Sequence, residues 1–124
     1  MTIEKAIKRV DELVHNEFPP SEKIAWLSNV DWMVKNHILD NHEGAENIIF
    51  NGYHEEIDSK TVLLVPEPYD KIYLYWLEAQ IHLYTGEYDK YSNAITLYNT
   101  EFDAYSAHYT CNHMPQNKGR RFLF

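Results

Sequence analysis

The sequence has few of the residues that form redox, metal or phosphate-binding sites. Its 124 residues include one cysteine, Cys111, and only four glycines. A single cysteine excludes an internal disulfide and a cysteine zinc cage, and it suits a reducing compartment. The glycines form no phosphate-binding loop, and there is no nucleophile elbow. We find no signal peptide and no apolar run of membrane-spanning length, so we expect a soluble, cytoplasmically made protein without membrane contact.

Basic residues are also scarce. Lys and Arg number 11 against 19 Asp and Glu, which gives a formal net charge of -8. This excess of negative charge opposes general binding to nucleic-acid phosphates and to anionic membranes. A chain of this length fits one domain with one modest core.

Seven histidines raise the question of a metal or catalytic site, but their spacing does not support one. The pair His108 and His113 is five positions apart, not four as in an HExxH helix. The run from His54 to Glu56 is more typical of a solvated surface than of a ligand set. Cys111 beside His108 lacks the orienting third group of a nucleophile and base pair, and is more typical of a helix end. We therefore predict no metal, no cofactor, no catalytic residues and no enzymatic activity.

Aromatic residues at helical spacing are what the sequence has in abundance. Between positions 87 and 112, apolar and aromatic residues recur in steps of three and four, which predicts one long helix. They are Tyr88, Tyr91, Ile95, Tyr98, Phe102, Tyr105 and Tyr109. Such a helix would be roughly 40 Å long, longer than a compact domain of this size, so we expect one end to reach past the core. We predict that the five tyrosines contact a partner there; the alternative is that they form the rim of the chain's own core.

Three further helices are predicted. Thr2 can cap the first, whose apolar stripe would be Ile3, Ala6, Ile7, Val10, Leu13 and Val14. The second would begin at its N-cap Ser21 and stop at Gly44. The third, over about 70–85, is apolar almost all round, which predicts the most buried helix. Asp70 can cap it, and Gly86 can end it in a left-handed conformation and turn the chain into an antiparallel hairpin.

Helical periodicity disappears between the second and third helices. We expect an irregular excursion over about 45–67 that can include short strands, with a turn at Asn51-Gly52. Asp31 lies at the rim of the second helix's apolar arc. It is either an exposed carboxylate, the commoner case, or a buried anion that caps or pairs with a neighbouring element.

The predicted architecture is therefore mainly α, a small four-helix bundle with a long C-terminal helical hairpin. Residues 1–115 would form a single domain and residues 116–124 a flexible tail. In this tail the cations Lys118, Arg120 and Arg121 precede the apolar residues Phe122, Leu123 and Phe124. We include Arg120, Arg121, Phe122 and Phe124 among the predicted interaction residues, because three terminal apolar residues can dock onto a neighbour.

The hairpin also resembles a tetratricopeptide helix pair, with Ala79 as a small residue and a similar turn. Tyr91 stands where these repeats usually pack an alanine, and no second copy with the 34-residue period is present. The likeness nevertheless gives an alternative function: a scaffolding or regulatory module that binds a partner peptide in an aromatic groove between the last two helices.

A more specific resemblance covers most of the chain and is strongest over residues 63–115. Its parts are Pro68-Tyr69-Asp70, the turn from Tyr84 to Tyr88, and the ending from Tyr109 to Pro115. Trp26-Leu27 ahead of Asp31 is a fourth matching part. In these parts the chain is similar to the small head-to-tail connector proteins, also called neck adaptor or head completion proteins, of tailed phages and prophages of Gram-positive bacteria.

This resemblance implies a non-enzymatic structural protein of the virion neck, made in the cytoplasm of a bacterial host. Its partners would be the portal protein and a tail-side adaptor. Copies of the chain, monomeric in isolation, would assemble there into a ring through which DNA passes without sequence-specific binding. An acidic inner surface of such a ring would repel DNA and prevent sticking.

Overall fold

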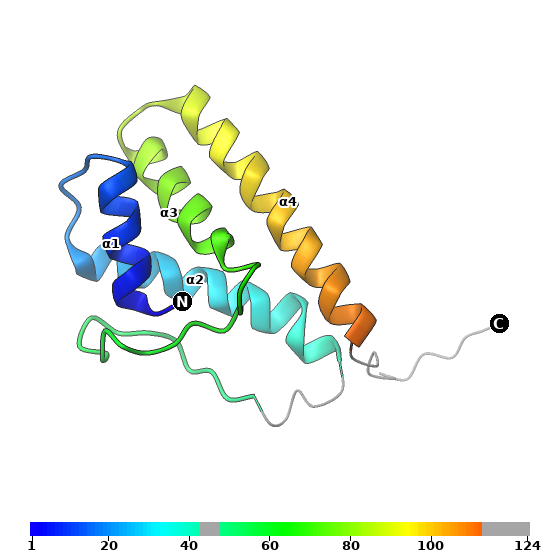
Figure 1. Cartoon of the computed structure of the whole chain (residues 1–124). Coiled ribbons are helices and arrows are strands. Elements are labelled where there is room, and N and C mark those ends of the chain that lie inside the picture. The colour runs from blue at the N-terminus through cyan, green and yellow to red at the C-terminus, as the bar shows by residue number, and fades with distance from the viewer. Residues whose placement is uncertain (43–47, 113–124) are drawn as a thin grey trace.

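The computed structural model describes residues 1–42 and 48–112 of the chain. Four α-helices follow one another in this part, as predicted: α1 (Ile3–Leu13), α2 (Pro20–His37), α3 (Lys71–Tyr84) and α4 (Tyr88–Asn112) (Figure 1). A short 3-10 helix, η1 (Leu39–Asn41), follows α2. The described residues contain no β-strand, and an isolated antiparallel bridge joins Thr2 and Val62. The protein is therefore a mainly α, small helical bundle.

Helix α1 begins as its sequence predicts. The Thr2 hydroxyl accepts a hydrogen bond from the Lys5 amide at 3.2 Å, which satisfies one of the free N–H groups of the first turn. Ile3, Ala6 and Val10 of the expected stripe are buried. Leu13 is 48 % exposed, because the stripe reaches the edge of the core in the last turn of the helix.

Both predicted ends of α2 need correction. The helix starts at Pro20 rather than after Ser21, and proline fits the first helical position because the N–H it lacks would have no partner there. The helix stops at His37, well before Gly44, which lies outside the described residues. The chain tightens into η1 at this point, and a ring nitrogen of His42, Nδ1, lies 2.6 Å from the Ile38 carbonyl. This contact gives a carbonyl at the helix end a partner that further helix would otherwise supply.

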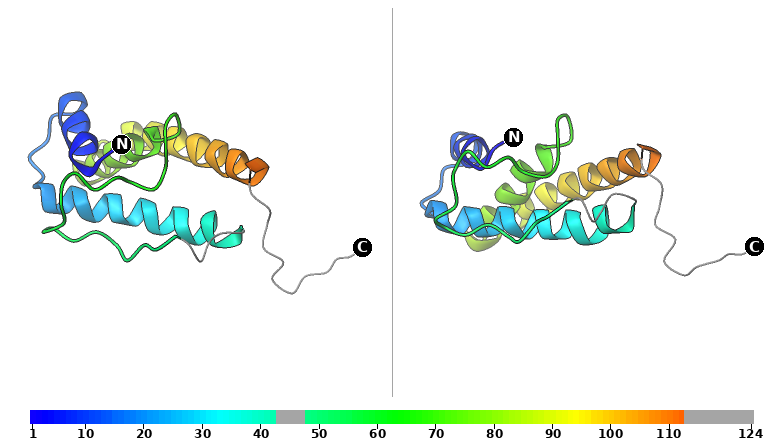
Figure 2. Two further views of the ribbon diagram at one scale, coloured as in Figure 1. Left: turned by 60° about the horizontal axis from the view of Figure 1, so that its bottom comes forward. Right: turned by 90° about the horizontal axis from the view of Figure 1, so that it is seen from below.

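Helices α3 and α4 form the predicted antiparallel hairpin. Gly86 ends α3 with a φ of 81°, the left-handed conformation that glycine adopts without strain. At 1.5 Å per residue, the 25 residues of α4 extend over about 37 Å and the 14 residues of α3 over about 21 Å. Helix α4 therefore continues well past the start of α3, as Figures 1 and 2 show.

The described part of the predicted excursion before α3 is irregular, as expected, and we call residues 48–70 the strap. Its carbonyls accept hydrogen bonds from the first turn of α1: Ile3 N to Thr61 O at 3.1 Å, and Glu4 N to Ser59 O at 2.9 Å. The views in Figure 2 show the strap passing along α2 and α1. The short strands that we expected do not form within residues 48–67, where Val62 makes an isolated bridge to Thr2.

Candidate interaction surface

Asp31 of α2 holds the strap and α3 in place. Its side chain is fully buried, and one of its oxygens accepts a hydrogen bond from the Tyr73 hydroxyl of α3 at 2.6 Å. The other oxygen accepts from the Leu64 amide at 3.2 Å and from the Tyr53 hydroxyl, both in the strap. The Tyr73 hydroxyl in turn accepts from the Val65 amide at 2.8 Å. Of the two readings that the sequence left open for Asp31, a buried group paired with neighbouring elements is therefore the correct one.

Burial and hydrogen bonding act in opposite directions on this group. Burial raises the pKa of Asp31 above its ordinary value, while the bonds from Tyr53, Tyr73 and Leu64 oppose the rise. Burial and the Asp31 charge also raise the pKa of Tyr53 and of Tyr73. Both tyrosines therefore stay protonated and act as donors. The arrangement is a structural anchor, since its polar atoms form hydrogen bonds with one another inside the fold.

The C-terminal part of the tyrosine stripe on α4 belongs to the chain's own core. Tyr98, Tyr105 and Tyr109 are only 5 %, 4 % and 8 % exposed. The Tyr98 ring lies 5.0 Å from Trp76 of α3, and the Tyr105 ring lies 5.6 Å from Tyr69 of the strap. Burial raises the pKa of Tyr105 to about 12. These three tyrosines therefore form the rim of the chain's own core, which was the alternative to a partner contact. Their rings fill space that a peptide groove would need in the alternative function.

The overhanging end of α4 is also partly covered. The His42 ring, just after η1, packs edge-on against Tyr109 at 5.0 Å, and its Nε2 atom lies 3.1 Å from the Thr110 hydroxyl. Tyr69 of the strap contacts the His108 ring at 4.9 Å. These contacts come from segments outside the helical hairpin, which is why the periodicity of α4 alone did not reveal them.

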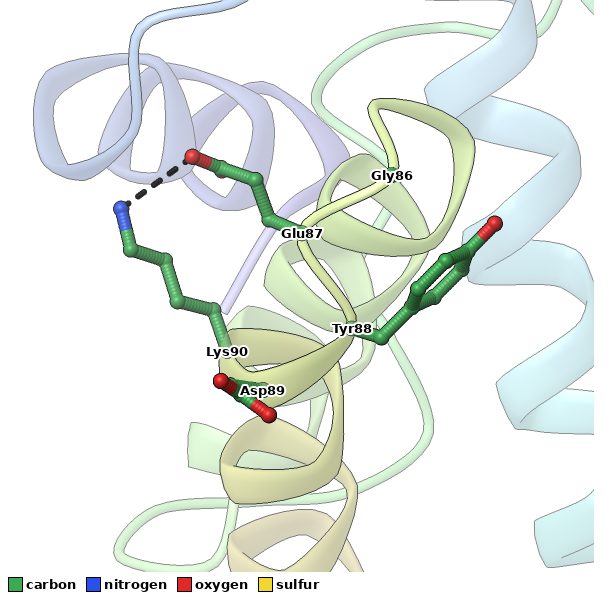
Figure 3. A pocket seen from close by; sticks show the side chains of 5 residues that line it. All are labelled: Gly86, Glu87, Tyr88, Asp89 and Lys90. Atoms are coloured by element: carbon green, nitrogen blue, oxygen red, sulfur yellow. Dashed lines mark hydrogen bonds and ion pairs between the residues drawn. The ribbon is translucent and has the colours of Figure 1, made fainter.

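Of the predicted interaction tyrosines, Tyr88 and Tyr91 remain accessible. Tyr88 is 65 % exposed and Tyr91 is half-buried. Figure 3 shows the Tyr88 ring projecting away from its helix. Arg120, Arg121, Phe122 and Phe124 lie outside the described residues, so their predicted role stays a prediction.

Exposed aromatic residues gather at the end of the molecule where the α1–α2 loop meets the α3–α4 turn. Tyr84, 62 % exposed, stacks on buried Trp26 with ring centres 5.9 Å apart, and Phe18 of the loop lies 6.3 Å from Tyr84. Sequence reasoning missed Phe18 and Tyr84 as site residues. A partial signal was present, because Phe18 directly precedes Pro19-Pro20 and Tyr84 stands two positions before Gly86. That the loop and the turn lie close together is a property of the fold (Figure 1).

Two open hollows flank these rings. One of about 510 Å³ is lined by His15, Asn16, Glu17, Phe18, Pro19 and Thr85. The second, of about 370 Å³, is lined by Gly86, Glu87, Tyr88, Asp89 and Lys90 (Figure 3). We call the surface formed by Glu17, Phe18, Tyr84, Glu87 and Tyr88 the turn-end surface.

The turn-end surface is acidic as well as aromatic. Glu17, Glu87 and Asp89 line the two hollows, and among their lining residues Lys90 is the only Lys or Arg. Lys90 is itself paired with Glu87 at 3.3 Å, as the dashed line in Figure 3 marks. The hydrogen bond from His82 and the contact with Lys90 lower the pKa of Glu87, so this carboxylate is ionised at neutral pH.

The histidines, Cys111 and the helices are the candidate parts of a metal site or a membrane span. Among them, no group of three or more His, Cys, Asp or Glu side chains could hold a metal ion. Cys111 is exposed, and His113 lies outside the described residues. None of the helices in residues 1–42 and 48–112 combines the length and the apolar character needed to cross a bilayer. The features described above are side-chain packing and surfaces suited to contact.

Comparison with protein-family models, with curated protein sequences and with solved structures gave no match for this chain. The functional reading therefore depends on the sequence resemblance and on the surfaces described above.

Proposed function

We propose that this chain is a non-enzymatic structural adaptor of the tailed-phage neck, which joins the capsid portal to the tail as a ring of identical copies. The observation that carries the proposal is the free outward face of α4. Residues 92–112 contain only two Asp, Glu, Lys or Arg residues, Glu101 and Asp103. A helix face with so little charge is suited to contact with other protein.

The exposure pattern along α4 supports this role. Leu97 is 47 % exposed on the face turned away from α3, and Thr100, Ala104 and Ala107 are also exposed. In a ring, each copy presents two different surfaces to its neighbours, and a free subunit leaves both uncovered. In the proposal, the portal organises such open subunits into a closed ring.

The charge of the chain supports the proposed location. A net charge of -8 repels the phosphate backbone, so DNA would pass through an acidic ring without adhering to it. In the proposal the chain is made in the bacterial cytoplasm and becomes part of the virion. Its partners are the portal protein and a tail-side adaptor.

The test is to mix the purified chain with purified portal complexes and to image the product by cryo-electron microscopy. The proposal expects a ring of additional density at the tail-facing end of the portal. At low concentration, size-exclusion chromatography should show the free chain as a monomer and the mixture as a larger complex. If the portal complexes carry no such density and the chain elutes alone, the connector proposal is wrong.

A further inference from the structure

We infer that the C-terminal segment of one copy, residues 118–124, docks onto the turn-end surface of a neighbouring copy. This inference deepens the proposed ring assembly and depends on it only for closure of the ring, because the pairwise contact can be tested alone. It begins with the exposed aromatic rings of the surface. Tyr84 and Tyr88 are 62 % and 65 % exposed. Tyr84 stacks on Trp26 and Tyr88 lines a hollow, so apolar side chains of another segment can pack beside both rings.

The chemistry of the segment is complementary to that of the surface. Lys118, Arg120 and Arg121 precede three apolar residues, and residues 113–124 contain no Asp or Glu. The rest of the chain carries the remaining 8 Lys and Arg against all 19 Asp and Glu. Arginine pairs with carboxylates in a bidentate way, and Glu17 and Glu87 provide carboxylates on either side of the aromatic rings.

The apolar end of the segment has a matching place on the surface. The hollow of about 510 Å³ next to Phe18 is of a size that receives an aromatic side chain. Phe122 or Phe124 in this hollow would contact Phe18, which lies 6.3 Å from the Tyr84 ring. Aromatic pairs add to the free energy gained from burial alone.

Geometry favours a neighbouring copy over the same chain. Helix α4 begins at the turn-end surface and carries the chain about 37 Å away before the segment starts. The 12 residues after Asn112 reach at most roughly 40 Å when fully extended. A return to the chain's own turn-end surface would use all of that length, whereas a second copy placed end to end receives the segment without strain. Such a contact joins two different surfaces and can repeat around a ring.

The experiment uses the full chain and two charge-reversed variants. The segment variant carries Arg120→Glu and Arg121→Glu, and the surface variant carries Glu17→Lys and Glu87→Lys. Sedimentation velocity over a concentration series should show self-association of the original chain. Each variant should associate at least 10-fold more weakly. A control with Glu55→Lys and Glu56→Lys, exposed residues of the strap, makes the same change in net charge as the surface variant and should keep the association.

Mixing the two variants decides between neighbours and self-docking. The original segment on the surface variant faces the original surface on the segment variant, so the mixture should form a one-to-one pair that neither variant forms alone. Raising the salt concentration should weaken the pair, because its ionic contacts are exposed. A synthetic peptide of residues 113–124 should compete with it.

Three outcomes would overturn the inference: a chain that stays monomeric at every concentration, a mixture that forms no pair, or a control variant that loses association equally. Circular dichroism of each variant excludes unfolding as the cause. Failure here is distinct from failure of the connector role. If the segment variant still forms a ring on the portal, the connector role holds and the docking of the segment is wrong. If the chain pairs in solution but forms no ring on the portal, the docking holds and the connector role is wrong.

Discussion

The strap and α4 are held against the same core by different means. The strap has no regular structure, and it is fixed by polar contacts. Tyr53 and Leu64 donate to buried Asp31, Val65 donates to the Tyr73 hydroxyl, and two strap carbonyls accept from the first turn of α1. Helix α4 satisfies its own backbone and is fixed by aromatic packing on α3 and the strap. An irregular segment must find partners for its backbone groups, whereas a helix needs only an apolar face to be covered. The outward face of α4 is left exposed, because only its inner face is needed for this packing.

The largest expected effect comes from removing the polar anchor of the strap. Asp31→Ala leaves the hydroxyls of Tyr53 and Tyr73 and the amide of Leu64 without an acceptor inside the fold. At roughly 1–2 kcal/mol for each stranded donor, we expect a loss of about 4 kcal/mol in the free energy of unfolding. Urea denaturation measures the loss, and hydrogen exchange at the Leu64 and Val65 amides should accelerate.

The matched control is Asp40→Ala. Like Asp31, Asp40 accepts a hydrogen bond. Its donor is the Lys35 ammonium at 2.8 Å, but the Asp40 side chain is 37 % exposed. Its removal should cost less than about 1 kcal/mol. A loss of similar size in both variants would mean that Asp31 has no special role in holding the strap.

The strap also marks where sequence reasoning reached its limit. Asp31 was recognisable as a candidate for burial because of its place at the rim of an apolar arc. Its partners were not recognisable, since Tyr53 and Leu64 are 22 and 33 positions away in a segment without periodicity. Hydrogen bonds between distant irregular segments leave no spacing pattern in a sequence.

The aromatic side of the comparison is tested by two tyrosines on the same helix. Tyr98→Ala opens a cavity beside Trp76 and should cost about 3 kcal/mol of unfolding free energy. Tyr88→Ala removes a ring that is 65 % exposed and should cost less than about 0.5 kcal/mol. Thermal and urea unfolding of the two variants measure this contrast. Equal losses would show that the stripe is not divided into a core part and a surface part.

The division of this stripe is what periodicity could not provide. The sequence placed α4 to within one residue, from Glu87 in the prediction to Tyr88 in the structure, and it identified Gly86 as the turn. All seven residues of the stripe have the same helical spacing. Which of them are covered depends on the positions of Trp76 in α3, Tyr69 in the strap and His42 after η1, and these are properties of the assembled fold.

Two glycines with similar backbone conformations offer a finer comparison of the strap with the hairpin. Gly86 has a φ of 81° with open space around it, so Gly86→Ala should cost about 1 kcal/mol from backbone strain alone. Gly52 in the strap has a φ of 87°, and an added Cβ would lie 3.2 Å from Trp32 and 3.4 Å from Ser28. Gly52→Ala should therefore cost more, about 2 kcal/mol. Melting temperatures of the pair test the order; the reverse order would mean that the strap yields more easily than the turn.

The smallest expected effect is a pH dependence at the polar anchor. Because burial raises the pKa of Asp31 in the folded chain, the folded state holds this proton more tightly than the unfolded state, whose pKa is about 3.9. Protonated Asp31 therefore contributes its full stabilisation of the folded chain below the unfolded pKa. This contribution is lost as the pH rises through the raised pKa of the folded chain. Asp31→Asn keeps the group neutral at every pH.

The measurement is the difference in unfolding free energy between the original chain and Asp31→Asn from pH 3 upward. Groups present in both chains, such as Glu78, whose pKa burial also raises, cancel in this difference. The original chain should lose stability relative to the variant as the pH rises, and the difference should level off above the folded pKa. A difference that grows in favour of the original chain would show that the bonds from Tyr53, Tyr73 and Leu64 outweigh burial. In that case the strap would be held by a stabilised carboxylate, and its anchor would weaken in acid.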